Sequence, residues 1–238
     1  MFKTIRQYNS YTSKKVTTAA YILFPVVILS VFGVITLFIK TSDMQELTVI
    51  LTVLSAIAMA YLIVVNCLAD RFSIGTILVN NLQTNEMVKT SPKGEKMVLN
   101  VVVWDTFVKF FSTVAVFLGV FIARFYYRQG TIFQLIGITI FCILSTHFMC
   151  SLICWICRKI ENNTIAVLIQ SFGTLHILPF ILLSLLLPVK VIPVWISGPA
   201  AAVYLIGDVI VNVVGILVLK GFIKKSWYRD VNSKGQKR

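Results

Sequence analysis

Charged residues are scarce in this chain, and acidic residues are the scarcest of them. Of the 238 residues only 13% are charged, including nine Asp and Glu, whereas 58% are hydrophobic. A soluble domain carries roughly 25% charged residues, so the composition excludes a soluble enzyme, a secreted disulfide scaffold and a disordered chain. The apolar residues form long unbroken runs, whereas the strands of a membrane β-barrel alternate over roughly 10 residues. The sequence therefore predicts an all-α membrane protein.

Several chemical motifs are also missing. The chain has no G-x-x-x-x-G-K-[ST] sequence, so it is not expected to bind ATP through a phosphate-cradling loop. The five cysteines all lie within apolar runs, which gives no disulfide framework around an extramembrane domain. The first apolar run, 19–39, is too long for the core of a signal peptide, and we interpret it as a retained span.

Six apolar segments reach the roughly 20 residues, at 1.5 Å each, that a helix needs to cross a bilayer. They are predicted at 19–39, 47–68, 101–123, 131–155, 165–187 and 200–222. No connection between them is long enough for a separate domain, so residues 1–238 are predicted to form a single transmembrane domain.

The basic residues indicate the orientation of these spans. Seventeen of the 22 Lys and Arg residues lie in the N-terminal arm, the second and fourth connections and the C-terminal tail. Four lie in the alternate connections, and Lys109 lies within a span. Because basic loops stay on the cytoplasmic side of a membrane, both termini are predicted to be cytosolic.

The cytosolic segment 69–96 is the longest connection. Its second half fits a short amphipathic helix that ends at Thr90, because Pro92 disfavours helical backbone at the residue before it. Ser91-Pro92-Lys93-Gly94 is a turn signal. The alternative is an ordinary polar loop with one amphipathic turn. As a helix, the segment presents a patch for a soluble partner that comprises Leu82, Glu86, Met87, Val88, Lys89, Ser91 and Pro92.

This layout resembles the permease subunit of type-2 ABC exporters. In that family a coupling helix between spans two and three ends in a Ser-Pro or Thr-Pro element with basic residues, directly before span three. The residues from Glu86 to Lys96 look like that element. The proline-rich outer segment 188–199, PVKVIPVWISGP, also looks like the short re-entrant helices of the family.

The resemblance implies a division of labour between subunits. A separate ATP-binding cassette subunit, carrying ATP and Mg, would dock on the coupling helix, and this chain would hold no cofactor of its own. A second permease copy, identical or related, would complete the path in the plasma membrane, most simply the bacterial cytoplasmic membrane. An amphipathic or hydrophobic cargo, such as a peptide, a bacteriocin, a lipid or a drug, would be exported.

Ionisable residues within the spans are costly and therefore candidates for function. Asp105 and Lys109 are four residues apart on one helix face and are predicted to form an ion pair; the simplest role for this pair is to anchor the helix. Asp208 and Asn212 share the same spacing in the last span. Asp208 is the best single candidate for the translocation path, and an interhelical hydrogen bond is its rival role.

Two further polar residues, His176 and Gln170, lie in the fifth predicted span. His176 is near the midplane, where a contact with Asp208 on another helix is one interpretation. The simpler interpretation is a neutral histidine that is hydrogen-bonded to a backbone carbonyl. We therefore add His176, Gln170 and Asn212 to the translocation-path candidates beside Asp208. The small residues that suit close packing of helices are Gly173, Ala200, Ala201, Ala202, Gly207 and Gly215.

His147 lies three and seven residues before Cys150 and Cys154, on one face of the fourth span. This pattern raises a metal site or a Cys/His nucleophile as alternatives. No acidic ligand is near in sequence, and membrane cysteines commonly pack as small apolar groups, so neither a metal site nor a catalytic residue is predicted.

Two other functions stay open at this stage. A membrane-embedded enzyme such as a peptidase would use His147, His176, Cys154 or Asp208, but no two of these have a recognised catalytic spacing. A stand-alone ion-coupled transporter often contains internal repeats, and we find none in this chain. The exporter subunit is therefore the leading hypothesis.

Overall fold

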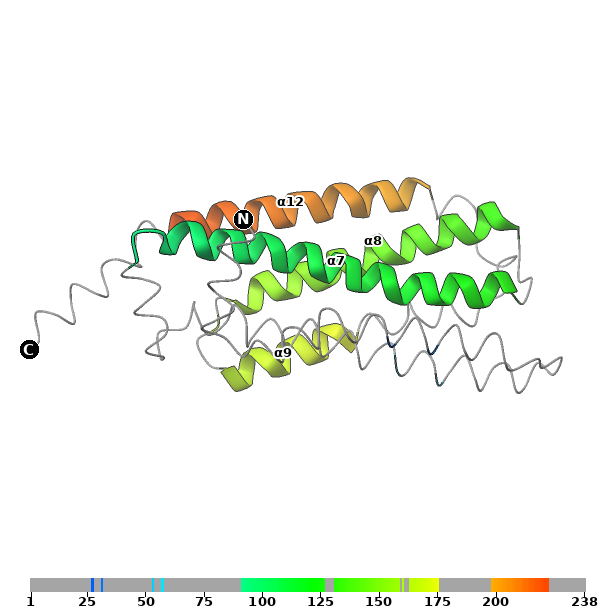
Figure 1. Cartoon of the computed structure of the whole chain (residues 1–238), viewed down its shortest axis with the longest axis horizontal. Helices are drawn as coiled ribbons and strands as arrows, with labels where there is room; N and C mark the ends of the chain where they lie inside the picture. Colours follow the sequence, from blue (N-terminus) through cyan, green and yellow to red (C-terminus); the bar gives the residue numbers. More distant parts are fainter. Residues whose placement is uncertain are drawn as a thin grey trace, which may run out of the picture.

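The structure is a computed structural model that describes residues 91–126, 131–158, 160, 163–175 and 198–222, with single helical residues at 27, 31, 53 and 57. Every secondary-structure element in these ranges is an α-helix, as the composition predicts. The elements are α7 (Gly94–Tyr126), α8 (Ile132–Cys157), α9 (Asn163–Leu175) and α12 (Pro199–Phe222) (Figure 1).

Three of these helices are long and apolar enough to cross a membrane, over Gly94–Ile122, Ile132–Cys157 and Pro199–Gly221. At 1.5 Å per residue the 26 residues of α8 extend over about 39 Å, more than the roughly 30 Å of a hydrocarbon core. The three helices α7, α8 and α12 correspond to the third, fourth and sixth predicted spans. α9 corresponds to the first part of the predicted span 165–187.

Several predictions fall outside the described residues. Apart from the four single residues, these are the spans 19–39 and 47–68, the cytosolic segment up to residue 90, and the outer segment up to residue 197. The docking residues Leu82, Glu86, Met87, Val88 and Lys89 belong to this group, and so does the path candidate His176.

The predicted turn before the third span is present. The backbone N–H of Gly94 donates to the carbonyl oxygen of Ser91 at 2.9 Å, and the N–H of Met97 donates to that of Lys93 at 2.9 Å. α7 thus begins at Gly94, seven residues before the predicted span starts at 101. The charged residues Glu95 and Lys96 are compatible with the first turn of a helix, although they are not apolar. Glu95 in that turn interacts favourably with the positive end of the helix dipole.

The starts of α8 and α12 also have local causes. At α8 the backbone N–H of Thr131 donates to Oε1 of Gln134 at 3.3 Å, which satisfies one group at the helix start. α12 begins at Pro199, where the missing N–H of proline costs no helical hydrogen bond. The N–H of Ala202 then donates to the carbonyl of Gly198 at 3.2 Å.

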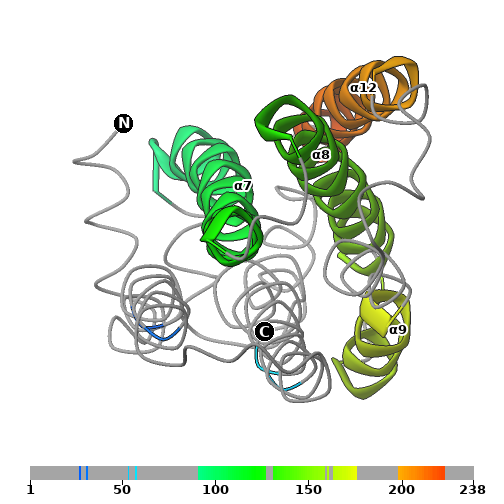
Figure 2. The same ribbon diagram turned by 90° about the vertical axis from the view of Figure 1, so that its right-hand side faces the viewer.

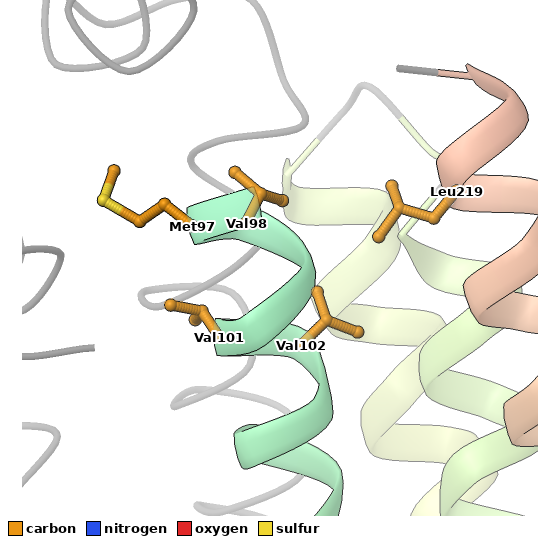
Figure 3. Close-up of a cluster of buried hydrophobic side chains, with 5 residues drawn as sticks. All are labelled: Met97, Val98, Val101, Val102 and Leu219. Atoms are coloured by element: carbon orange, nitrogen blue, oxygen red, sulfur yellow. The ribbon is translucent and has the colours of Figure 1, made fainter. Parts of the chain in front are cut away.

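α8 is the central helix of the described bundle and packs against α7, α9 and α12 (Figure 2). α12 also contacts α7 near one end. There Leu219 of α12 lies against a buried apolar cluster at the start of α7, formed by Met97, Val98, Val101 and Val102 (Figure 3). α12 is the peripheral helix, since only 11% of its apolar stretch is buried, against 50% for α8.

The contacts determine the relative directions of the helices. Phe148 of α8 lies against Gly207 of α12, and Trp155 lies against Gly215, so the residue numbers rise together and the two helices are parallel. Leu219, near the end of α12, meets the start of α7, so these two are antiparallel. The start of α7 therefore shares one end of the bundle with the ends of α8 and α12 (Figure 1). These are the relative directions that the predicted order of spans requires.

Glycines allow the close approach of these helices, as the sequence predicts. A Cβ atom at Gly207 would lie 2.9 Å from Cε2 of Phe148, and one at Gly173 would lie 2.7 Å from Cδ1 of Ile153. A Cβ atom at Gly215 would overlap the indole of Trp155. A larger side chain at these positions would displace Ile153, Phe148 or Trp155 of α8, or the helices themselves.

Candidate functional site

Five polar or charged side chains from three helices lie in the interior of the bundle, in the half that contains the start of α7 and the ends of α8 and α12. Asp105 and Lys109 come from α7, Arg158 ends α8, and their exposed fractions are 2%, 5% and 6%. Lys, Arg and Asp are almost never so deeply buried unless they are paired. His147, 3% exposed, and Asp208 extend this polar interior further along α8 and α12.

Asp105 is the centre of the charged cluster. Its Oδ2 atom lies 2.6 Å from Nζ of Lys109, which is the ion pair that the i,i+4 spacing predicts. The same oxygen accepts a hydrogen bond from Nη2 of Arg158 at 2.9 Å. The sequence places Arg158 in a polar connection, yet the structure buries it. The Asp105 carboxylate therefore links α7 to Arg158 at the end of α8, and it also pairs with Lys109 on its own helix.

The two cations have further partners on α8. Nζ of Lys109 donates to Sγ of Cys154 at 3.8 Å. The guanidinium of Arg158 lies over the indole of Trp155, 4.5 Å from the ring centroid, in the geometry of a cation–π contact. The face of the Trp155 ring thus contacts the charged cluster, while its N–H is directed toward Asn212 of α12.

A second polar cluster joins α8 to α12. Nδ1 of His147 lies 2.9 Å from both carboxylate oxygens of Asp208. The side-chain amide of Asn212 donates to the carbonyl oxygen of Asp208 at 2.9 Å and to its Oδ1 at 3.1 Å. Nε1 of Trp155 in turn donates to Oδ1 of Asn212 at 3.1 Å. Asn212 is held at both ends, which orients its amide.

Trp155 links the two clusters into one polar chain. This chain of polar groups starts at Arg158, at the end of α8, and reaches His147 in the middle of the helix. The two residues are eleven positions apart, or about 16 Å at the helical rise. Asp208 lies nine residues, or about 14 Å, into α12. The chain therefore extends from one end of the bundle to about halfway along it.

The far side of His147 contacts α7. The ring of Phe110 meets the imidazole edge to face, with centroids 5.2 Å apart and planes at 88°. Nε2 of His147 is buried, and no hydrogen-bond partner for it is found in the part of the chain that the structure describes. A buried polar atom of this kind costs roughly 1–3 kcal/mol, so it is a position at which an external group would be stabilised.

The sequence predicts part of this site. Asp208 and Asn212 are both path candidates from the sequence, and they are in hydrogen-bond contact with each other. The histidine on Asp208 is His147, whereas the meeting considered from the sequence is with His176, which lies outside the described residues. Gln170 of α9 is 1% exposed, and none of the contacts given above connects it to this chain of polar groups.

The metal alternative gains no support from the described helices. Among their residues no group of three or more His, Cys, Asp or Glu side chains is arranged to hold a metal ion. The side chains of Cys142, Cys150, Cys154 and Cys157 are buried. His147 has an acidic neighbour after all, but 61 residues away in sequence, where no local pattern indicates it.

Comparisons with known proteins add no relative from which a role could be transferred. No family model matches the chain, and neither the curated proteins nor the solved structures contain a similar chain. A function is therefore inferred from the buried polar chain, the directions of the helices and the resemblance in layout.

Proposed function

We propose that this chain is the membrane-embedded permease subunit of an ABC exporter, with six spans and both termini in the cytosol. The observation that carries the proposal is the junction at Ser91–Gly94. There a hydrogen-bonded turn leads directly into α7, as the resemblance requires of the element that follows a coupling helix. Ser91 Oγ also accepts from the N–H of Lys93 at 3.4 Å, and Pro92 has a fixed backbone angle, so the junction is stiff.

The distribution of charge supports the proposed orientation. The start of α7 contributes Lys93 and Lys96, the end of α8 contributes Arg158, and the last turn of α12 contributes Lys220, all at one end of the bundle. Because basic residues favour the cytoplasmic face, this end is proposed to be cytosolic. The partner ATPase would approach the bundle from that side.

The proposed mechanism passes movement from the partner to the bundle through α7. ATP and Mg would bind to the partner subunit, which would contact the docking residues within the segment that runs from Leu82 to Pro92. Displacement of that segment would move the rigid turn and the first residues of α7. The buried bond between Asp105 and Arg158 would then carry the movement of α7 to α8. A second permease copy would complete the path for an amphipathic or hydrophobic cargo.

The proposal is tested by purification of the chain from its native membrane in a mild detergent. We expect an ATPase with a Walker motif to copurify with the wild-type chain. M87E/V88E should abolish this association, because two charges would be placed on the proposed docking patch. Q83E/N85D adds two negative charges to the same segment outside the docking residues, and it should leave the association intact.

Two results would overturn the proposal. One is a wild-type chain that purifies alone or only with further copies of itself. The other is cargo export that persists in the M87E/V88E variant at normal expression, which would remove the docking role from Met87 and Val88.

The His147–Asp208 pair favours a second candidate, a stand-alone transporter coupled to protons. Ionisable pairs near the middle of membrane helices commonly belong to ion or proton pathways. The discriminating measurement is transport by the purified chain in proteoliposomes without any ATPase. Transport that follows an imposed proton gradient would favour this candidate, whereas dependence on ATP and the partner subunit would favour the exporter.

A further inference from the structure

We propose that Nε2 of His147 is a proton-binding site held in place by Asp208, and that its protonation changes the contact between α8 and α12. This inference does not depend on the partner ATPase, because it rests on contacts within the chain. It also applies whether the chain exports its cargo with ATP or alone.

The geometry assigns different tasks to the two ring nitrogens. Nδ1 lies 2.9 Å from both oxygens of Asp208, so in the neutral ring the proton belongs on Nδ1, where it is donated to the carboxylate. Nε2 then carries the lone pair. A hydronium ion transfers its proton to Nε2 and leaves as water, which produces an imidazolium. Transfer of that proton back to a water molecule, which leaves as hydronium, restores the neutral ring. The Asp208 carboxylate faces the positive charge in the protonated form.

The burial of Nε2 is the second observation that points to a ligand there. His147 is 3% exposed, and its Nε2 has no partner among the described residues. The Nε2 lone pair is therefore not engaged by any described group, and it can take up a proton. The positive charge that the proton adds is compensated by the Asp208 carboxylate at Nδ1, on the other side of the ring. Phe110 of α7 contacts the same ring, so a small shift of α7 relative to α8 would change access to the imidazole.

The charged surroundings make the site responsive to a single proton. α7 contributes Asp105 and Lys109, α8 contributes Arg158, and α12 contributes Asp208. With a neutral imidazole these four groups carry two positive and two negative charges. A proton on His147 therefore adds one positive charge to these four described groups, whose charges are balanced.

Uncharged titratable groups near His147 are also present among the described residues. They are the thiols of Cys150 and Cys154 on α8 and the phenol of Tyr204, one turn before Asp208 on α12. The described residues of α9, Asn163–Leu175, contain no ionisable side chain. Histidine is the residue type whose charge changes between about pH 5 and about pH 8, which sets the pH range of the experiment.

A path from the ring to the helix contact is present. A charge-assisted hydrogen bond is roughly twice as strong as a neutral one, so the imidazolium draws the Asp208 carboxylate more strongly than the neutral ring does. Asn212 donates to the same Oδ1 atom and accepts from Nε1 of Trp155. Trp155 packs against Gly215, so a change at Asp208 reaches the surface where α12 meets α8.

The experiment uses the full chain in lipid nanodiscs with ¹⁵N-labelled histidine and tryptophan. The chain contains only two histidines, so either H176Q or H147Q assigns their NMR signals, whichever of the two variants folds better. W155F assigns the indole signal of Trp155. Spectra are recorded from about pH 5 to about pH 8.5, the range in which a histidine changes charge.

We expect His147 to be an imidazolium at the acidic end and a neutral ring protonated on Nδ1 at the basic end. The indole N–H signal of Trp155 should shift with the same midpoint. In D208N the imidazolium signal should be lost over the whole range, and the Trp155 shift should be lost with it.

Three outcomes would overturn the inference. An imidazole that stays in one protonation state over the range removes the proton site. A titration of His147 that D208N leaves unchanged removes the role of Asp208. A titration that is not followed by the indole of Trp155 removes the coupling to the contact between α8 and α12.

Discussion

Replacement of Asp105 by asparagine is the most informative single change in the charged cluster. D105N keeps the shape of the side chain but removes the charge that Lys109 and Arg158 share. All three side chains are buried, so water does not replace the lost partner in the folded state. The introduced amide would offer its oxygen to one donor, and two cations would face each other across a neutral group.

The magnitude follows from the burial of the pair. Removal of one partner from a buried ion pair costs roughly 3–5 kcal/mol, because the other charge stays buried without compensation. Lys109 keeps its contact with Cys154 and Arg158 keeps its contact with Trp155, so we expect the lower part of this range. For a chain of this size each kcal/mol lowers the melting temperature by about 2–4 °C. D105N should therefore melt roughly 6–12 °C below the wild type.

The chain supplies its own probe for this measurement. The four cysteines of α8 are buried, so a thiol-reactive fluorescent dye would label them only as the bundle unfolds. The melting temperature is read from the rise in dye fluorescence during heating in detergent. E95Q is the matched control, because it removes a carboxylate from the same helix at a residue that is not fully buried. The loss there should be at most about 1 kcal/mol.

A D105N variant that melts within about 2 °C of the wild type would refute this reasoning, since the loss would be below about 1 kcal/mol. It would mean that the buried cations do not depend on Asp105. An equal fall in the melting temperature of E95Q would also refute this reasoning. The loss of stability would then come from the net charge of α7 and not from the buried cluster.

Two further changes test the contacts of α8. G215A should lower the free energy of unfolding by about 1–3 kcal/mol, because its Cβ would overlap the indole of Trp155. G221A, with open space around its Cβ, should have little effect in the same thermal assay. R158K keeps the charge beside Asp105 but loses the planar group over Trp155; we expect a loss of about 1–2 kcal/mol, and unchanged stability would show that the stacking contributes nothing.

The local features of the described helices were readable from the sequence. The apolar runs at 101–123, 131–155 and 200–222 predict α7, α8 and α12, since a bilayer accepts a backbone only when its polar groups bond within the helix. The pair of Asp105 with Lys109 follows from four-residue spacing on one helix. The turn at Ser91–Gly94 follows from the angle preferences of proline and glycine. Each of these rests on neighbours in the chain.

The start of α7 shows where that local reasoning falls short. The apolar run predicts a span from 101, yet the helix begins at Gly94, because charged residues in a first turn oppose burial in lipid but not helix formation. Hydropathy therefore indicates the membrane segment, whereas the backbone hydrogen bonds decide the helix end.

The site itself was decided by packing between helices. Asp105 and Arg158 are 53 residues apart, and His147 and Asp208 are 61 residues apart. No spacing rule connects such residues, because which helix faces which depends on where small residues allow close approach. Gly207 and Gly215 let α12 lie parallel to α8, which brings Asp208 to His147 and Asn212 to Trp155. Composition and spacing determined the helices and the local ion pair, and only their packing created the buried polar chain.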